Sequence, residues 1–538
     1  MSTPQPPPQQ LPALFCSIGS PTSCISNQQL RDTVEKFLES LGARDDVLLL
    51  PPDFTRFHSQ AGKITRFISE YYNFTEREDV TTRVSTTSSS SPSIQIIPAL
   101  GTHAPMKQEQ IELMFGSNLA NKKTHNINDD SSSPFVVHNW RDDVVTIGYA
   151  PEEMVEKATH GMVKEKWPAQ LNKLVWEKGI RRESDTSGIE EGDGASKCNP
   201  LVISIGQVVP HEVTGMANYN KNLFVGVGGV EAINLSHFIG AVHGMEKLMG
   251  RGSNPLREIL NYSSSKYLEQ ELDLWYILTV MGPSSSPKSG SNDDHGDDVE
   301  MNGLFIGRDV TCYDLACDLS LQVNFNLLES SPKKVVVYLN EEYHSTWLGN
   351  KSIYRTRMAI DDGGELVVLA PWVETFGEDE CIDALIRKVG YVGTPNIMKA
   401  MGNDEELKRN LSAVAHLIHG SSEGRFSVTY CPGKLTKEEV ESVGYNYADL
   451  EHMKQVYNIE TLKEGWNTRT DENGIKEEFY YISNPALGLW AHPSRFEVDE
   501  SHSSDTTTNG DVAISSNQEA SDGSGGVGGW KKPPREPA

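Results

Sequence analysis

The chain has 538 residues, of which 37% are hydrophobic and 23% charged, a balance typical of a soluble globular protein with two or three domains. No apolar run approaches the length needed to cross a bilayer. The net charge of −27 argues against nucleic acid and anionic membranes as partners, because the field of the protein would repel both. A small anionic substrate is compatible with this charge if the site itself gathers Arg and Lys.

The ends and several internal stretches differ in composition from the rest of the chain. Residues 1–12 are rich in Pro and Gln and residues 499–538 in Ser, Asp and Gly, so both segments are expected to be disordered. Four similar stretches are expected to be surface-loop insertions: 81–93, 126–134, 182–197 and 284–300. The start of the chain lacks the pattern of a secretory signal, and the seven cysteines are scattered, so a cytoplasmic protein is expected.

Short β-rich runs alternate with amphipathic helices along the chain. In the first half, strands are predicted at 46–50, 93–100, 135–140, 201–206 and 223–228, and helices at 64–72, 107–116 and 238–250. In the second half, strands are predicted at 275–282, 302–307, 333–340, 365–371 and 425–431. The helices predicted between them are 312–327, 352–360, 381–391, 407–420 and 436–445.

This alternation predicts an α/β fold with two α/β domains, whose mostly parallel sheets are flanked by helices. A boundary near 265–270 gives an N-terminal domain over 13–265 and a C-terminal domain over 270–498. Ligands of such folds bind at the carboxyl ends of strands and in clefts between domains. The active site is therefore expected in the interdomain cleft.

Two histidines, His103 and His211, lie in turns that follow apolar strands. A pair of histidines suits proton transfer in both directions near neutral pH, since either ring can act as base or acid. For each residue alone, the alternative is a strand-end histidine whose ring is hydrogen-bonded to the backbone.

Lys221 lies shortly before a glycine-rich turn, Gly226-Val-Gly-Gly229, which is a candidate phosphate cradle. Beside such a turn a lysine grips phosphate as a point charge, although most lysines are ordinary surface residues. His237 follows and precedes the helix predicted at 238–250.

Three charged residues complete the set of candidates. Asp53 and Arg56 follow the strand at 46–50, and Lys351 is expected on a helix of the second domain. Arg56 offers a planar fork to a carboxylate and Lys351 a second positive charge, while a structural Asp53–Arg56 ion pair is the alternative. His416 and His419 lie one helical turn apart, but the sequence shows no third metal ligand beside them.

The order and spacing of these motifs resemble those of the lactate racemase family, whose enzymes carry a nickel-pincer nucleotide. The resemblance covers roughly residues 40–490 and includes the following segments: Asp53-Phe-Thr-Arg56, Gly101-Thr-His103, His211, Lys221, His237 and Lys351. It implies an isomerase that inverts the C2 stereocentre of a 2-hydroxyacid by hydride transfer to and from the cofactor. The implied partners are a small anionic 2-hydroxyacid substrate and the enzymes that assemble the cofactor.

The resemblance also implies roles for the catalytic and substrate-binding residues. His103 and His211 would flank the substrate, one on each face, as an acid/base pair. Asp53, Arg56 and Lys351 would bind the substrate.

Two further residues are implied to hold the cofactor, a pyridinium-3,5-bisthiocarboxylic acid mononucleotide with nickel. Lys221 would form a covalent link to it, and His237 would be the only protein ligand to the metal. Square-planar coordination by imidazole and soft donors suits Ni(II), and a single protein ligand requires the cofactor to bring the other three donors.

The chain departs from the family pattern in three places. The family's run of small residues before Lys221 is replaced by Gly215-Met-Ala-Asn-Tyr-Asn220. The family's glutamine three positions before Lys351 is replaced by Leu348. The family's second-domain tryptophan is not recognisable within 403–420. These changes favour a larger or more polar acid than lactate, such as a sugar acid, with which Asn218, Asn220 and Asn350 would form hydrogen bonds.

A different class of function is a catalytically silent protein of the same fold that binds a small molecule or the cofactor. The presence of both His103 and His211 counts against it, because binding alone needs no paired acid/base groups. A zinc hydrolase is disfavoured because no three-ligand cluster has suitable spacing.

Overall fold

The computed structural model describes residues 11–75, 92–126, 129–180, 199–284, 299–470 and 474–496. Of the ends expected to be disordered, residues 1–10 and 499–538 lie outside these ranges, as do most residues of the expected insertions. Leu11 is described and packs against the core of the first sheet. The insertion expected at 126–134 contains a strand, β5 (Asp129–Ser132), that pairs antiparallel with β4 (Thr124–Asn126). Among the described residues, no helix combines the length and the apolar character needed to cross a membrane.

The first sheet has six strands in the order β1-β12-β11-β8-β2-β3. Their bounds are β1 (Leu14–Gly19), β2 (Asp46–Leu50), β3 (Ser93–Ile96), β8 (Pro200–Gln207), β11 (Leu274–Pro283) and β12 (Val299–Gly307). β11, β8, β2 and β3 run parallel, and β12 pairs antiparallel with β1 and β11. Alternate residues of β2 enter two different cores: Val47 and Leu49 pack on one face of the sheet, Leu48 and Leu50 on the other.

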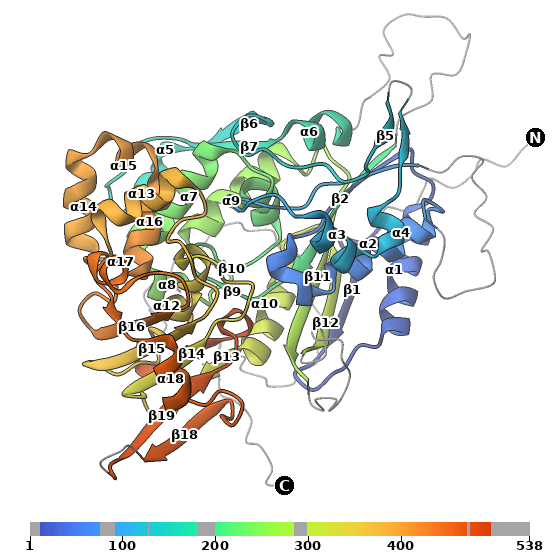
Figure 1. Cartoon of the computed structure of the whole chain (residues 1–538). Helices are drawn as coiled ribbons and strands as arrows, with labels where there is room; N and C mark the ends of the chain where they lie inside the picture. The colour runs from blue at the N-terminus through green and yellow to red at the C-terminus, as the bar shows by residue number, and fades with distance from the viewer. Residues whose placement is uncertain are drawn as a thin grey trace, which may run out of the picture.

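Helices cover both faces of this sheet (Figure 1). The helices of the described chain up to residue 324 are α1 (Asn27–Leu41), α2 (Ala61–Tyr71), α3 (Gln108–Phe115), α4 (Ser117–Ala120), α5 (Glu152–Ala158), α6 (Lys173–Gly179), α7 (Val230–His243), α8 (Met245–Leu248), α9 (Pro255–Tyr267) and α10 (Val310–Asn324). A separate hairpin pairs β6 (Val144–Ala150) with β7 (Trp167–Asn172). α1 shows how local chemistry sets the bounds: the Ser26 side chain accepts a hydrogen bond from the Gln29 amide at its start, and Gly42 ends it with φ 73°.

The second sheet also has six strands, in the order β17-β16-β15-β14-β19-β18. Their bounds are β14 (Lys334–Tyr338), β15 (Gly364–Ala370), β16 (Phe426–Pro432), β17 (Asn446–Tyr447), β18 (Gly465–Thr470) and β19 (Lys476–Ile482). All neighbours run parallel except β18 and β19. The accompanying helices are α11 (Thr346–Gly349), α12 (Lys351–Thr356), α13 (Glu380–Val389), α14 (Thr394–Asn403), α15 (Glu405–Arg409), α16 (Leu411–Gly420), α17 (Lys437–Ser442) and α18 (Leu450–Val456). A short parallel pair joins β13 (Phe325–Leu327) to β20 (Leu489–Ala491).

The two parts of the chain meet along α7 and α16. We call the described residues up to 324 the N-terminal part and those from 325 on the C-terminal part. α16, orange in Figure 1, lies against the green α7, and the Ser412 hydroxyl donates to Asn234 Oδ1 at 2.6 Å. Glu246 of the N-terminal part accepts from both Arg357 (3.0 Å) and Arg425 (3.1 Å). Packing and ion pairs therefore join α7 and α8 to the C-terminal part.

The predicted fold class is confirmed: the chain is α/β, with mostly parallel sheets flanked by helices. Two strands predicted for the C-terminal domain, β11 and β12, are nevertheless hydrogen-bonded into the first sheet. The sheets therefore change after residue 307 and not near 265–270. The domain boundary itself stays a prediction.

Two predicted strands are wrong, and one predicted helix starts earlier than predicted. Residues 135–140 form no strand and contribute one isolated bridge, between Ile96 and Phe135. Residues 223–228, predicted as a strand, form η2 (Asn222–Gly226), a single π-helical turn that is buried throughout. The helix predicted at 238–250 begins at Val230, so His237 lies inside α7. The run at 223–228 is short and buried on every side, so it carries no periodicity that separates strand from helix.

The π-helical turn gives a testable prediction through Gly228, because a Cβ there would lie 1.9 Å from the Phe224 carbonyl oxygen. Gly228→Ala should destabilise the protein by about 2 kcal/mol, since the backbone has to move to relieve this contact. Gly402→Ala is the matched control in α14, where a Cβ would meet nothing within 4 Å. It should be neutral or stabilise by about 0.5 kcal/mol. Denaturant unfolding measures both, and an equal effect of the two substitutions would contradict the packing described.

Candidate functional site

Three neighbouring parallel strands end at one edge of the first sheet, and each is followed by a predicted site residue. Asp53 and Arg56 follow β2: Asp53 directly precedes η1 (Phe54–Ser59), and Arg56 lies within it. His103 lies in the turn after β3, where Gly101 adopts φ 59° and its amide donates to the Gly226 carbonyl at 2.8 Å. His211 ends β9 (Pro210–His211), shortly after β8. Since β8, β2 and β3 are adjacent, their carboxyl ends bring these side chains together.

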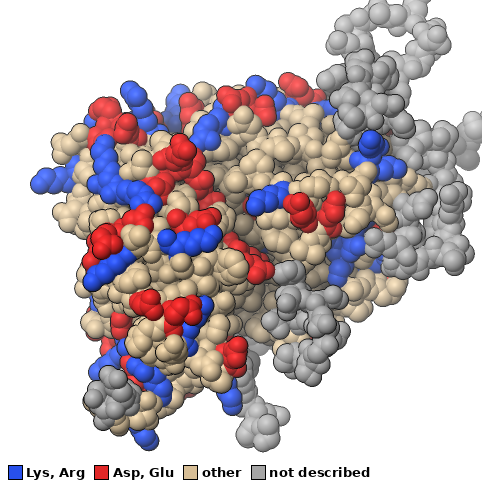
Figure 2. Space-filling view, in the orientation of Figure 1, with Lys and Arg blue, Asp and Glu red and all other residues tan. Residues whose placement is uncertain are grey.

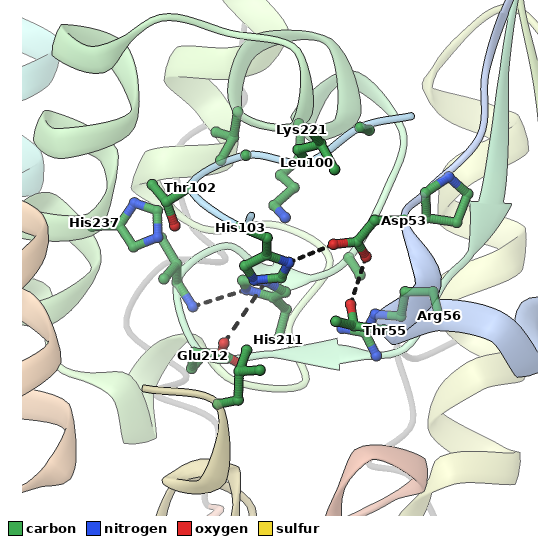
Figure 3. Close-up of a pocket in the computed structure, with 18 of the residues that line it drawn as sticks. Asp53, Thr55, Arg56, Leu100, Thr102, His103, His211, Glu212, Lys221 and His237 are labelled. Atoms are coloured by element: carbon green, nitrogen blue, oxygen red, sulfur yellow. Dashed lines mark hydrogen bonds and ion pairs between the residues drawn. The ribbon is translucent and has the colours of Figure 1, made fainter. Parts of the chain in front are cut away.

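One pocket gathers all seven predicted site residues. They are Asp53, Arg56, His103, His211, Lys221, His237 and Lys351. In Figure 3 the Lys221 amine and the His237 ring point toward the space around His103 and His211. Residues of both parts of the chain line this pocket, with Trp347, Leu348, Ser412, His416 and His419 contributed by the C-terminal part.

The Asp53 carboxylate holds the His103 ring. His103 Nδ1 lies 2.6 Å from Asp53 Oδ2, and the Thr55 hydroxyl donates to Asp53 Oδ1 at 2.6 Å (Figure 3). Burial would raise the pKa of Asp53, but His103, Thr55 and Lys351 together lower it below its usual value. The ionised carboxylate therefore fixes a proton on Nδ1 and leaves Nε2 as a base. Asp53 contacts His103 and also lines the pocket, and its contact with substrate stays a prediction.

His211 has a different hydrogen-bond arrangement. The amide of Val213 donates to His211 Nδ1 at 3.1 Å, and Nε2 lies 3.9 Å from Glu212 Oε1. Burial lowers the pKa of His211 well below its usual value; Glu212 opposes this, and Lys221 and Arg56 add to it. The ring is therefore neutral. Glu212 was missed at the sequence level because a carboxylate beside a histidine in a turn carries no distinctive spacing.

Lys221 is positioned by a turn in which two residues other than glycine have left-handed backbone, Asn218 (φ 64°) and Tyr219 (φ 60°). The Tyr219 ring stacks on that of Tyr313 at 5.1 Å. The backbone of this loop thus adopts conformations that favour glycine, although the chain has the bulkier residues noted in the sequence. Such conformations cost free energy and persist only where packing and hydrogen bonds hold them.

Arg257 on α9 supplies much of that support. Its buried guanidinium donates to the Met216 carbonyl and to Asn220 Oδ1, each at 2.6 Å, and lies over the Tyr313 ring at 4.5 Å. Asn220 is therefore committed to the loop and does not line the pocket, nor does Asn350, whose amide donates to Tyr445. Of the three asparagines expected to contact substrate, Asn218 alone lines the pocket.

The pocket concentrates positive charge. Burial, followed by the charge of Arg56, lowers the pKa of Lys221 to about 8, and the same two causes lower the pKa of Lys351 to about 8. Burial also lowers the pKa of Arg355, on α12 behind the pocket, to about 10. Arg56 Nη1 is buried and has no hydrogen-bond partner among the described residues. These groups favour an anionic ligand.

His237 has one ring nitrogen available to a ligand. It lies within α7, and its Nδ1 donates to the Ile233 carbonyl, one turn back, at 2.7 Å. Burial lowers its pKa to about 4, so the ring is neutral and Nε2 keeps its lone pair. A backbone carbonyl on Nδ1 is a common way to orient an imidazole that ligates a metal through Nε2.

The described residues contain no cluster of three or more His, Cys, Asp or Glu side chains able to hold a metal ion. A metal bound here would need donors that come with a cofactor. The donor set fits that requirement, because a neutral imidazole and a buried amine of lowered pKa line the same pocket. Cβ atoms at Gly228 and Gly229 would meet Phe224 and Gln170, so these two glycines are closely packed against protein atoms. The phosphate cradle at this turn stays a prediction.

Several pocket residues from the C-terminal part were missed or only half recognised in the sequence. An indole does line the pocket, that of Trp347 in α11, outside the segment 403–420. It stacks on the His416 ring at 4.6 Å, and both His416 nitrogens are hydrogen-bonded, to Tyr354 and Tyr391. His416 is thus part of a buried hydrogen-bond network and is not free to ligate a metal. Only the tertiary fold brings these positions to the pocket.

Arg257→Met tests the support of the Lys221 loop. The substitution should destabilise the protein by about 2 kcal/mol, because it leaves loop acceptors unpaired and strained backbone unsupported. Arg141→Met is the matched control, since the Arg141 side chain is 52% exposed in its pair with Asp379. It should change stability by less than about 0.5 kcal/mol. Equal shifts in the unfolding midpoint would contradict the role given to Arg257.

The lowered pKa of Lys221 predicts that its amine reacts at lower pH than an ordinary lysine with a small reagent that modifies amines. Burial and Arg56 disfavour the ammonium, so the neutral amine predominates above about pH 8, against about 10.4 for an ordinary lysine. Modification of Lys221, followed by peptide mass spectrometry, should therefore rise with a midpoint near pH 8. The exposed Lys437 provides the reference curve, and coincident curves for the two lysines would contradict the prediction.

Comparison with known proteins identifies the fold. No family model matches the chain, and no curated protein matches its sequence. A crystal structure of a protein from Thermotoga maritima is similar with a TM-score of 0.64 and 20% identity, over 87% of this chain and 98% of that one. The lactate racemase apoprotein from Thermoanaerobacterium thermosaccharolyticum is similar with a TM-score of 0.56 and 14% identity, over 87% and 94%. This chain therefore has a lactate racemase-like fold.

Proposed function

We propose that this protein is a racemase or epimerase that inverts the C2 stereocentre of a 2-hydroxyacid with the help of a nickel-pincer nucleotide. The observation that carries the proposal is the convergence of the Asp53–His103 pair, His211, Lys221 and His237 on one pocket. The lactate racemase-like fold supports it independently. We further propose that this pocket is the cleft between two domains and that the enzyme works in the cytoplasm.

Lys221 and His237 would hold the cofactor, Lys221 through its amine and His237 through Nε2 to nickel. When bound, the cofactor supplies a hydride acceptor. The lowered pKa of Lys221 favours covalent attachment, because a neutral amine is the nucleophile in such a bond. Enzymes that assemble the cofactor are accordingly proposed as partners.

The remaining residues bind the substrate and move its proton. Arg56 and Lys351, from opposite parts of the chain, would bind the carboxylate, where the unpartnered Arg56 Nη1 offers a donor. His103 Nε2 would take the proton of the 2-hydroxyl on one face, and Asp53 would stabilise the resulting imidazolium. His211 would contact the 2-hydroxyl on the other face. Burial of the site keeps water from a bound keto acid.

The acid itself is proposed to be larger or more polar than lactate, and a sugar acid fits best. Leu348 lines the pocket where the family resemblance implies a glutamine, and His419 Nε2 is a buried polar atom of the pocket wall without a partner among the described residues. A substrate hydroxyl is a suitable partner for that atom. Comparison of initial rates on a panel of hydroxyacids would contradict this preference if lactate turned over fastest.

The surface charge is relevant to whether the partner is a small molecule, a nucleic acid or a membrane. Acidic and basic side chains alternate over the visible face, which shows no broad patch of Lys and Arg (Figure 2). Together with the net charge of −27, this supports a small molecule and not a nucleic acid or a membrane as the partner.

The proposal predicts the outcome of producing the chain together with cofactor-assembly enzymes. The purified protein should contain nickel, carry a covalent adduct on Lys221 by peptide mass spectrometry, and epimerise a 2-hydroxyacid. His103→Gln should keep the nickel and the adduct but lose about 10²–10⁴-fold in kcat, because it removes the base alone. Lys221→Ala should lose the adduct. Protein with neither nickel nor adduct under these conditions would refute the proposal, and a loaded protein without turnover would favour a silent binding protein.

A further inference from the structure

Glu212 lines the pocket beside His211, and the function proposed above gives it no role. Its side chain is 14% exposed, and its Oε2 atom is buried without a hydrogen-bond partner among the described residues. Burial would raise the pKa of this carboxyl, but His211, Arg355 and Lys351 together hold it well below its usual value. An ionised carboxylate therefore lies in the pocket wall beside His211.

The neighbouring His211 ring is set up to donate a hydrogen bond. Because the Val213 amide donates to Nδ1 at 3.1 Å, a neutral ring must carry its proton on Nε2. That nitrogen then has no lone pair with which to take a proton. In His103 the arrangement is reversed, since the Asp53 carboxylate lies on Nδ1 and leaves Nε2 free. The two histidines are thus in opposite tautomers.

Burial is the main cause that lowers the pKa of His211 and keeps its ring neutral. Lys221, Arg56 and Arg355 oppose a further positive charge, and Glu212 alone among the named neighbours favours one. A neutral imidazole that donates through Nε2 polarises a substrate oxygen without taking its proton. The proton of that oxygen needs another acceptor, and Glu212 Oε1 lies 3.9 Å from His211 Nε2. One substrate oxygen between the two side chains contacts both.

We propose that Glu212 is the catalytic base on the His211 side of the pocket and that His211 donates a hydrogen bond to the same substrate oxygen. The inference rests on the function proposed above. The O–H bond of the substrate breaks, its electron pair stays on oxygen, and a new O–H bond forms on the Glu212 carboxylate. In the reverse direction the carboxylic acid returns this proton to the oxygen. The two faces of the pocket thus use different bases, a carboxylate on one and the Asp53-backed His103 on the other.

The test separates the two faces by the enantiomer that each serves. Cofactor-loaded protein is mixed with one enantiomer of the best hydroxyacid, quenched with acid within a single turnover, and assayed for keto acid. Glu212→Gln should slow keto acid formation from one enantiomer by about 10²-fold or more. His103→Gln should slow it from the opposite enantiomer. Glu212→Asp should recover part of the loss, because it keeps the carboxylate that Gln lacks.

Three results would overturn the inference. In the first, Glu212→Gln forms keto acid from both enantiomers as fast as the unsubstituted protein. In the second, it slows keto acid formation from the same enantiomer as His103→Gln. Alternatively, Glu212→Asp would be slower than Glu212→Gln, which indicates that shape and not charge matters at this position. If the unsubstituted loaded protein oxidises neither enantiomer, the proposed function fails first and the role of Glu212 falls with it.

A second measurement needs no turnover. Hydrogen exchange at the ring Cε1 position, followed by mass spectrometry of the cofactor-free protein, gives a titration midpoint for each histidine. His211 should titrate below the exposed His452, and Glu212→Gln should lower the His211 midpoint further because it removes the only favourable charge among the named neighbours. A midpoint for His211 at or above that of His452 would show a ring that takes up protons readily. That result would return the role of base to His211 and overturn the inference.

Discussion

The parallel pairing of β2 with β3 and β8 is the constraint from which the site follows. Parallel neighbours place their carboxyl ends at one edge, so the residues after each strand meet in space although they are far apart in sequence. Asp53 and His103 come from adjacent strands and form a short hydrogen bond for this reason. A shift of one residue in either register would separate them and turn the strand's buried side chains to the opposite core.

Electrostatic repulsion within the pocket has to be balanced by the rest of the fold. Burial and the charge of Arg56 lower the pKa of both Lys221 and Lys351, and such an arrangement costs folding free energy. Asp53 and Glu212 offset part of it. The Lys221 loop adds backbone strain that Arg257 holds in place. Binding sites commonly carry costs of this kind, which a bound ligand reduces.

Much of the fold and most of the site could be predicted from the sequence, and the failures have a physical pattern. Apolar runs such as 46–50 and 201–206 are long enough, and clearly enough bounded, to be recognised as strands. The run at 223–228 has a similar composition but forms a π-helical turn, and a short buried run carries no periodicity that separates the two outcomes. Motif residues were found because their order along the chain is distinctive. Glu212, Arg257 and Trp347 were not, because their contacts are made only by tertiary packing.

The contact between α7 and α16 couples the stability of the N-terminal part of the chain to that of the C-terminal part. His237 lies on the first of these helices and Ser412 and His416 on the second, so a single helix pair contributes to the pocket wall from both parts of the chain. The basic side chains proposed to bind an anion also come from both parts, Arg56 from the N-terminal part and Lys351 from the C-terminal part. An anion held by both makes separation of the parts costlier than it is in the empty protein. Ligand binding and the cooperativity of unfolding are thereby linked through one interface.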